Sequence, residues 1–408
     1  MFDNLLYQPC ATQLSADIAQ HQLPGAILFS GAAASGKLTC ALEVARVLSC
    51  TGTPRGSWSC SCPSCRRNKE LASPALLLAG SRDCSLEIRA AVRALLHAAS
   101  AGEAYLIACR YLFVRAVRKL TLRFSAVLWE GDDKLPKLAP CLQSIDEQLE
   151  LLDIGKPLPE QAALEKITAE VLRQAEKLEG GFMYDALPID QIRRAAAWAH
   201  LKSASGKKVF VIESADRMSE GARNALLKTL EEPPEDTIFV LTTAHRGALL
   251  PTILSRVRTY TFAVRTAAQQ AEVLTRVFHA DADTIAAAST IDGYLQTFLP
   301  VSPAEVAQQA QTFVQSLATL AVGTAVDVAA VCKACAGFEP RVLLKIFLNR
   351  VLVAYEMETA SQVALAARAA HLVRECYDSV RLYNQTVQGA LERLWRDLFV
   401  DRRMASRW

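Results

Sequence analysis

A short run of residues near the N-terminus has the composition and spacing of a phosphate-binding loop. Residues 31–37 read GAAASGK, which fits the pattern G-x-x-x-x-G-K, and they follow the apolar run 26–30. Small residues in such a loop let backbone N–H groups surround a phosphate, while the lysine contacts its outer oxygens. The pattern therefore predicts a nucleotide-phosphate site formed by Gly31, Ser35, Gly36 and Lys37.

Two positions around this loop depart from what magnesium chemistry requires. The residue after the lysine normally supplies a hydroxyl ligand to Mg²⁺, but here it is Leu38, and Thr39 lies about 100° further around the helix. A later apolar run, 209–212, ends in Glu213 and Ser214, where acidic residues usually hold the metal and activate water. Glu213 is able to contact a hydrated metal, whereas Ser214 cannot act as a general base. These departures predict that ATP and Mg²⁺ are bound weakly or not at all.

Four cysteines within 16 residues form the strongest candidate metal site: Cys50, Cys60, Cys62 and Cys65. Four thiolates complete the tetrahedral shell of Zn²⁺ and leave no open position, so such a site is structural. The Cys60-x-Cys62 spacing is tighter than usual, and four free thiols are the alternative. A further C-x-x-C pair, Cys332 and Cys335, has no second pair nearby, so we interpret it as ordinary helix packing.

The whole chain has 408 residues, of which 51% are hydrophobic, with 45 Lys and Arg against 42 Asp and Glu. This composition excludes a mostly disordered protein and one that binds nucleic acid through bulk positive charge. The sequence shows neither a membrane-length apolar run nor a signal peptide, so we expect a cytoplasmic protein without a membrane partner. In that compartment its 12 cysteines are expected to be free thiols or metal ligands rather than disulfides.

Apolar runs alternate with helical patterns in the first 264 residues, which predicts an α/β fold with a parallel sheet. Strands are expected at 26–30, 76–78, 209–212, 237–241 and 260–262, and helices at 37–48, 187–204 and 219–231. After residue 263 the sequence reads as helices only.

Residues 85–186 do not fit this alternation and read instead as an inserted set of helices, expected at 88–99, 104–122 and 161–178. A self-folded insertion is tolerable because the entropy cost of closing a loop grows slowly with its length. Five basic residues lie in its second helix and just after it: Arg110, Arg115, Arg118, Lys119 and Arg123. They indicate either a helix that faces DNA or a partner protein, or a solvated face. The acidic stretch 130–153 favours the solvated face.

One stretch of the chain resembles a known family. Residues 224–234 read NALLKTLEEPP and are followed by FVLTT at 239–243 and TILSR at 252–256. This sequence resembles the bacterial DNA polymerase III clamp-loader subunits, the gamma/tau and delta-prime family of AAA+ proteins. The opening LPGAILFSG at 23–31 is similar to the family's first strand and loop, and the four cysteines lie where the family has a zinc module.

The resemblance covers about residues 1–80 and 187–264 and leaves 85–186 outside. It implies an AAA+ P-loop domain over 1–264, with a zinc module at 50–65 and a helical insertion at about 85–186, then a helical lid at 265–300 and an all-α collar bundle at 301–408. The implied partners are the delta and gamma/tau subunits, with the sliding clamp contacted indirectly and primed DNA bound as part of the complex. The implied function is clamp loading in DNA replication.

Within this family the gamma/tau subunits hydrolyse ATP, whereas delta-prime is a passive partner that lends an arginine finger to its neighbour. Leu38 and Ser214 make the chain resemble delta-prime. On that resemblance, Arg256 is the finger that reaches a neighbour's γ-phosphate, and Thr242 or Thr243 is the polar group at the sensor position. The four cysteines match the family's zinc ligands, although one gap is a residue short.

Two other functions stay open at this point. A gamma/tau-type motor requires that Thr39 or a water molecule replace the missing hydroxyl, and ATP turnover abolished by Lys37→Ala would identify it. The second is a stand-alone, zinc-dependent interaction protein that uses an inactive AAA+ scaffold. Such a protein would not co-purify with other polymerase III subunits.

Overall fold

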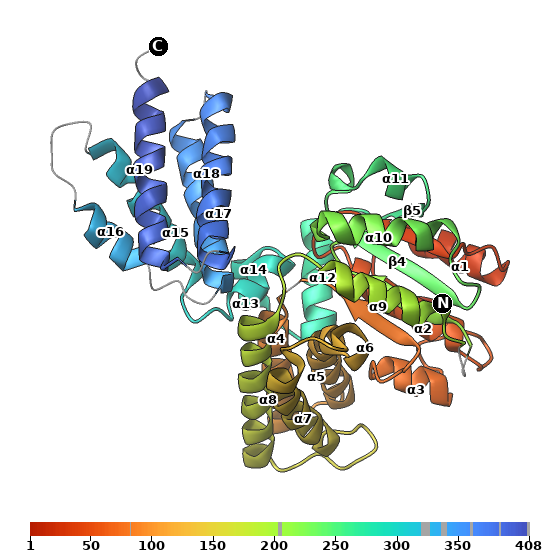
Figure 1. The fold of residues 1–408 in the computed structure, drawn as a ribbon. Helices are drawn as coiled ribbons and strands as arrows, with labels where there is room; N and C mark the ends of the chain where they lie inside the picture. The colour runs from red at the N-terminus through yellow and green to blue at the C-terminus, as the bar shows by residue number, and fades with distance from the viewer. Residues whose placement is uncertain are drawn as a thin grey trace. The chain divides into compact units, whose positions relative to one another are not determined.

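A computed structural model describes most of the chain (Figure 1), namely residues 1–81, 83–202, 206–319, 327–335, 341–359, 362–382 and 385–405. The chain divides into two compact units, Met1–Leu295 and Gln296–Trp408. Among the described helices, none combines the length and the apolar character that a membrane crossing requires.

The first unit is built on a five-stranded sheet with the strand order β2-β3-β4-β1-β5, and all four strand pairs are parallel. The strands are β1 Ala26–Ser30, β2 Leu76–Ala79, β3 Lys208–Ile212, β4 Thr237–Thr243 and β5 Arg258–Thr261. Every residue of β1 to β4 is buried, as expected for parallel strands covered on both faces. The predicted parallel sheet is therefore confirmed, with strand bounds that move by no more than two residues.

Successive residues of each strand point to opposite faces, so the sheet has an apolar core on either side. On one face Ile27 and Phe29 pack with helices α1 (Cys10–Ala19) and α2 (Lys37–Ser49). On the other face Leu28 and Phe210 pack with α9 (Ile189–His200), α10 (Glu220–Glu231) and α11 (Pro251–Leu254). Figure 1 shows α9 and α10 lying along the sheet next to β4.

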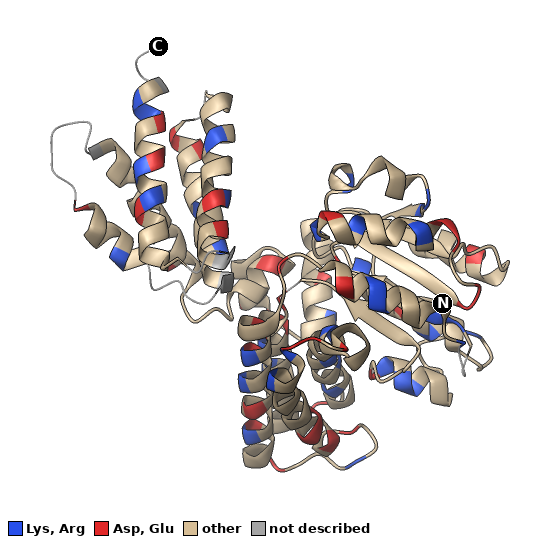
Figure 2. Ribbon diagram, in the orientation of Figure 1, with Lys and Arg blue, Asp and Glu red and all other residues tan. Residues whose placement is uncertain are grey.

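The segment between β2 and α9 is helical, as its sequence predicts. It contains α4 Ser85–Ala101, α5 Leu106–Thr121, a 3-10 turn at Leu122–Phe124, α6 Ala126–Trp129, α7 Leu135–Leu151 and α8 Gln161–Phe182. Figure 1 shows α4, α5, α7 and α8 grouped together, and their apolar residues join the same core as the α9 face of the sheet. Basic and acidic residues alternate along α8 instead of forming a face of one sign (Figure 2).

Both interpretations of the five basic residues in and after α5 are wrong. Arg110 is 6% exposed and donates to the carbonyls of Leu152 (2.9 Å) and Lys156 (2.9 Å) just beyond α7. Arg115 donates to Lys69 O (2.9 Å) and Arg118 to Glu70 O (3.0 Å), at the end of helix α3 (Pro63–Lys69). The last carbonyls of a helix have no partner within it, and these guanidinium groups supply one.

The other two basic residues of this set pair with acidic side chains. Lys119 pairs with Glu87 of α4, and Arg123 pairs with Glu213 at the end of β3. The set therefore holds the helical segment to the sheet and to α3 instead of forming an open basic face.

The loop before β1 and the turn after α10 touch one another. A Cβ atom added at Gly25 would lie 2.5 Å from Cγ of Pro233, closer than any real contact. The carbonyl of Gly25 also accepts a hydrogen bond from the N–H of Phe239 in β4 (2.7 Å). The glycine of the LPG motif is therefore required by the proline of the EPP motif.

Three further helices complete the first unit: α12 Ala267–Phe278, α13 Ala282–Ala288 and α14 Ile291–Gln296, which ends at the boundary. They return to the helical segment. The ring of His279 stacks on Tyr105 with 3.7 Å between ring centroids, and Arg93 donates to the Tyr294 hydroxyl (2.8 Å).

The described part of the second unit consists of helices with their own core: α15 Pro303–Thr319, α16 Val328–Cys335, α17 Arg341–Glu358, α18 Val363–Leu382 and α19 Val387–Ala405. Phe313, Phe347 and Trp395 are buried in this core, and the indole N–H of Trp395 donates to Ser316 Oγ (2.7 Å). Cys332 and Cys335 are buried there as well, in agreement with the helix-packing interpretation.

Candidate functional site

The predicted phosphate-binding loop forms the connection from β1 to α2. Gly36 caps α2 with φ of 94°, and Ala34 also has a positive φ of 54°. A Cβ atom at Gly31 would lie 2.6 Å from the carbonyl oxygen of Phe262, so only glycine fits there. Ser35 is 3% exposed. The loop thus wraps the N-terminus of a thirteen-residue helix, where free N–H groups favour an anion.

Lys37 is folded back onto this loop. Its ammonium donates to the carbonyls of Gly31 (2.7 Å) and Ala32 and to Ser35 Oγ (3.3 Å). Burial lowers the pKa of Lys37 to about 8, although the negative charges of Glu213, Asp216 and Asp292 oppose this shift. A phosphate in the loop would compete with these carbonyls for the ammonium.

Two other predicted residues lie at the same edge of the sheet. Glu213 follows β3 directly, and Thr242 is near the end of β4, which pairs with β1. The hydroxyl of Thr242 accepts a hydrogen bond from the N–H of Ser214 (3.2 Å), which has a φ of 55°. The structure therefore brings Lys37, Glu213 and Thr242 together at the carboxyl ends of parallel strands, where α/β sheets bind their ligands.

These residues do not fit a magnesium ion. Glu213 is 8% exposed and its carboxylate is ion-paired with the guanidinium of Arg123, which is 3% exposed. Leu38 packs against the core formed with α1, and Thr39 is half-buried in the first turn of α2. The hydroxyl ligand for Mg²⁺ is thus missing directly after the lysine, and the carboxylate of Glu213 is already neutralised by Arg123.

The helical segment adds a second buried carboxylate close to Arg123. Glu179 of α8 accepts hydrogen bonds from the N–H groups of Cys84 and Ser85 (3.2 Å) at the start of α4. Burial and the nearby charge of Asp83 raise the pKa of Glu179 to about 7, although these N–H donors and the charge of Arg123 lower it in part.

The pH dependence of thermal unfolding is expected to show the raised pKa of Glu179. An acid whose pKa rises from 4.5 to about 7 on folding stabilises the folded state in its protonated form. That contribution is lost as pH rises through this interval, by up to about 3 kcal/mol. The Tm of the wild type should therefore fall more steeply across the interval than the Tm of Glu179→Gln. Glu176→Gln, on the same helix but half-exposed beside Arg89, serves as the control. Parallel profiles for the wild type and Glu179→Gln would contradict the raised pKa.

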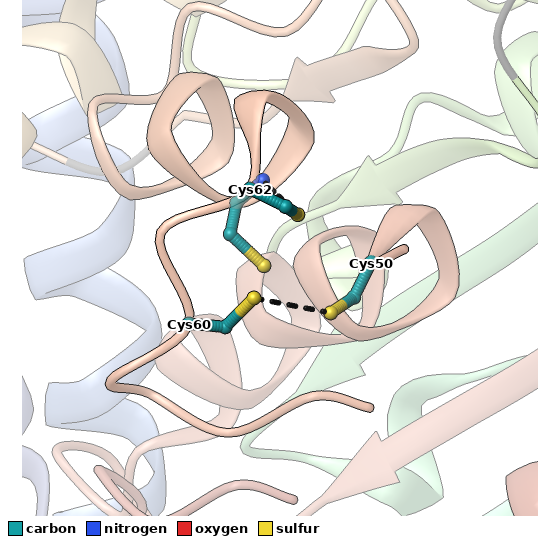
Figure 3. A group of neighbouring side chains, drawn as sticks. Cys50, Cys60 and Cys62 are labelled. Carbon is teal, nitrogen blue, oxygen red and sulfur yellow. Dashed lines mark hydrogen bonds between the residues drawn. The ribbon is translucent and has the colours of Figure 1, made fainter. Parts of the chain in front are cut away.

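The four predicted cysteines converge in space. Cys50 follows α2, Cys60 lies in the next loop, Cys62 precedes α3, and Cys65 belongs to α3. Their sulfur atoms all lie within 4.8 Å of one another, and those of Cys50 and Cys60 are 3.7 Å apart (Figure 3). A tetrahedral zinc ion with Zn–S bonds of about 2.3 Å places its sulfurs about 3.8 Å apart. The donor set fits Zn²⁺, and the tight Cys60-x-Cys62 spacing does not prevent this.

Backbone N–H groups donate hydrogen bonds to these sulfurs and so stabilise their thiolate form. Gly56 N donates to Cys50 Sγ (3.3 Å) and Cys65 N to Cys62 Sγ (3.4 Å). Burial opposes ionisation of Cys62, but N–H donors from Thr51 and Cys65 outweigh it and lower its pKa to about 5. Burial and the adjacent thiols raise the pKa of Cys65, so the cluster holds fewer than four thiolates until a cation balances their charge.

A buried ionic network surrounds the cysteines. Arg46 and Glu43 of α2 are fully buried and paired at 2.5 Å, and Arg46 also donates to Ser57 O (2.8 Å), Gly56 O (3.0 Å) and Cys65 Sγ (3.7 Å). The ring of Trp58 contacts three cations, from Arg46, Lys69 and Arg115, at 5.2 to 5.6 Å from its centroid.

The sequence analysis missed this network. The available signal was a Glu and an Arg at i,i+3 inside the otherwise largely apolar stretch KLTCALEVARVLS. Charged residues in such a position are expected to be paired.

Arg256 lies apart from the loop, between α11 and β5. Its side chain is 29% exposed, and it donates to Glu231 Oε1 (2.8 Å) at the end of α10 and to Thr252 O (2.7 Å). The guanidinium is thus held at the surface by one exposed carboxylate.

A family model described as "DNA polymerase III, delta subunit" matches residues 7–126 and 161–266, which is more than half of the chain. The chain belongs to this family. The match includes much of the helical segment 85–186, which we expected to fall outside the resemblance. Only residues 127–160, with α7, lie in the gap between the two matched parts.

Individual members of the polymerase III family match shorter stretches. DNA polymerase III subunit tau of Bacillus subtilis is 36% identical over 109 residues, or 27% of this chain and 19% of the relative. Subunit delta' of Haemophilus influenzae is 40% identical over 77 residues, or 19% and 24%. Subunit delta' of Bacillus subtilis is 50% identical over 58 residues, or 14% and 18%. The matches thus span less than a quarter of each of these relatives, and they include both subunit types.

A solved structure is also similar. The gamma subunit-related protein of Thermotoga maritima aligns over 58% of this chain and 90% of its own, with 17% sequence identity and a TM-score of 0.27.

Proposed function

We propose that this chain is a delta-prime-type subunit of the DNA polymerase III clamp loader, with an AAA+ module that does not hydrolyse ATP itself. The observation that carries this proposal is the chemistry around Lys37. The phosphate-binding loop keeps its glycines and its lysine, but Leu38 and Ser214 replace the hydroxyl and the carboxylate on which metal-dependent hydrolysis depends. A subunit with this loop contributes shape to an assembly and leaves ATP turnover to its neighbours.

The proposed partners are the delta and gamma/tau subunits, which together load the sliding clamp onto primed DNA. Arg256 would act on ATP bound by a neighbouring subunit, because it sits at the surface and its single carboxylate partner, Glu231, is exposed. The helices after residue 264 would supply the lid, at 265–300, and the oligomerising collar, at 301–408. Zinc on the four cysteines would be structural, with no open coordination position for chemistry.

Reconstitution with delta and gamma/tau subunits tests this proposal. The chain is expected to elute with them as one complex in size-exclusion chromatography, and to hydrolyse no ATP when alone. A chain that stays monomeric in the presence of both subunits would instead support the stand-alone zinc-dependent protein.

The motor-type subunit is the second candidate, because the match to tau is the longest of the three given above. It requires a magnesium ion at a site where Leu38 provides no ligand. ATP turnover by the isolated chain that is lost in Lys37→Ala would establish it and refute the delta-prime-type assignment.

A further inference from the structure

We propose that Arg123 is the permanent counter-cation of Glu213 and takes the place of a divalent metal beside the phosphate-binding loop. The pocket then selects metal-free polyphosphate, and its affinity for ATP does not depend on Mg²⁺. This inference deepens the proposed function, because it explains how a subunit retains the loop without the metal.

The contact joins two parts of the chain that are 90 residues apart. Arg123 lies in the 3-10 turn that follows α5, and Glu213 lies at the end of β3. Both side chains are withdrawn from water, with 2% and 9% of their surfaces exposed. A guanidinium is charged at every pH that proteins experience, so this cation cannot leave by losing a proton.

Arg123 is held in place from several directions. Its guanidinium donates to the carbonyl of Lys119 as well as to Glu213, and its own carbonyl accepts the indole N–H of Trp129 (2.8 Å). Trp129 and Phe124 are 1% exposed and pack with 5.3 Å between ring centroids. The side chain is thus part of a packed core, unlike an exposed arginine that can swing aside.

Glu213 is equally confined. A Cβ atom at Gly80, beyond the end of β2, would lie 2.9 Å from Cβ of Glu213, so glycine is what allows the two strand ends to approach. The charge of Arg123 also lowers the pKa of Glu179, so the same cation serves two buried carboxylates.

A metal ion at Glu213 would have to displace this guanidinium. The displaced charge would stay buried without its partner, and it would repel the metal at short range. Each effect acts against Mg²⁺, and no hydroxyl follows Lys37 to offset them. The arrangement therefore excludes the metal through a charge that the chain supplies itself.

Manganese binding to the purified, zinc-loaded full chain tests this directly, because Mn²⁺ bound to protein is resolved from free Mn²⁺ by electron paramagnetic resonance. Glu213→Gln is expected to bind Mn²⁺ within about 2-fold of the wild type, because Arg123 already pairs with the Glu213 carboxylate in the wild type. Arg123→Met is expected to gain a Mn²⁺ site that Arg123→Met/Glu213→Gln lacks. A wild-type Mn²⁺ site that Glu213→Gln weakens about 10-fold or more would overturn the proposal, as would a folded Arg123→Met that gains no site.

Titration with ATP, in resin-treated buffer without chelator, gives the second arm. The wild type is expected to bind ATP with a Kd that differs less than about 2-fold with and without Mg²⁺, and no binding in either condition would overturn the inference. Tighter binding with Mg²⁺ by about 10-fold or more would refute the inference. Ring assembly and the role of Arg256 are separate measurements, so their failure would not be confused with failure here.

Thermal unfolding covers the case in which Arg123→Met is too unstable for metal binding. Removal of one partner of a buried pair leaves an unpaired charge, which is expected to lower the Tm by about 5 °C or more. Arg123→Met/Glu213→Leu is expected to recover part of that loss, because both charges are then gone. A double variant at least as unstable as the sum of its single variants would show that the pair does not form in solution and would reject the proposal.

Discussion

Protein purified without chelators is expected to contain close to one zinc ion per chain, and Cys65→Ser is expected to lose most of it. The four sulfurs already lie within 4.8 Å of one another, and zinc binding supplies about 10–16 kcal/mol of apparent folding energy in isolated finger peptides. In a larger folded unit, loss of the zinc removes only part of this stabilisation, because the surrounding core remains. We therefore expect the Tm of Cys65→Ser to fall by about 10 °C or more. Elemental analysis and calorimetry measure the two effects.

Two further variants make this experiment specific. Cys332→Ser removes a buried cysteine of the second unit, and it should keep its zinc. Gly52→Ala keeps all four ligands, but its Cβ atom would lie 2.4 Å from Cys60 Sγ, so it should lose zinc as well. The matched control Gly247→Ala meets no atom within 4 Å. Wild-type protein with well under one zinc per chain would show that the cysteines are free thiols.

Arg256→Ala is expected to slow ATP turnover at the neighbouring site of the assembled loader by about 10³-fold, the lower end of the range for arginine fingers. The substitution should leave the isolated chain folded, because an exposed pair such as Arg256 and Glu231 contributes little stability. Arg256→Lys keeps the charge without the two-pronged geometry and should recover only part of the rate.

Single-turnover hydrolysis by the reconstituted loader measures this effect, and the Tm of each variant checks its folding. Arg246→Ala is the control, since Arg246 is exposed on the turn that precedes α11. Equal rates for Arg256→Ala and the wild type would exclude the finger role while leaving the ring-scaffold role in place.

Local patterns predicted the sheet well. Continuous apolar runs such as VFVI in β3 are typical of buried parallel strands, and Pro233 marks the end of α10 as expected from its missing N–H. The loop at 31–37 and the cysteine cluster were equally readable, because each places its functional groups within a few residues of one another.

Contacts between distant segments were not predictable in this way. Nothing in the local sequence around Arg123 points to Glu213 as its partner. The sequence around Arg115 likewise does not distinguish it from a solvent-exposed basic residue on a helix. The acidic stretch 130–153 suggested solvent around the basic set. Instead, backbone carbonyls just beyond the end of α7 accept hydrogen bonds from Arg110. Backbone acceptors of this kind cannot be recognised from the side-chain composition of the stretch.

The match to the family also reached further than the motifs suggested. The eleven-residue NALLKTLEEPP motif and the LPG loop carried the resemblance, whereas the family model extends through α4 and α5. Helices with Ala- and Leu-rich faces have few positions that distinguish one family from another, so single-sequence reasoning assigned them to an insertion.

The abutment of Gly25 on Pro233 has a practical consequence for engineering. The LPG stretch and the EPP stretch form a single contact, so a substitution in one constrains which residues the other can hold. Redesigned versions of this unit should therefore keep glycine at position 25 for as long as proline occupies position 233, because any larger residue would collide with the proline ring beside the start of β1.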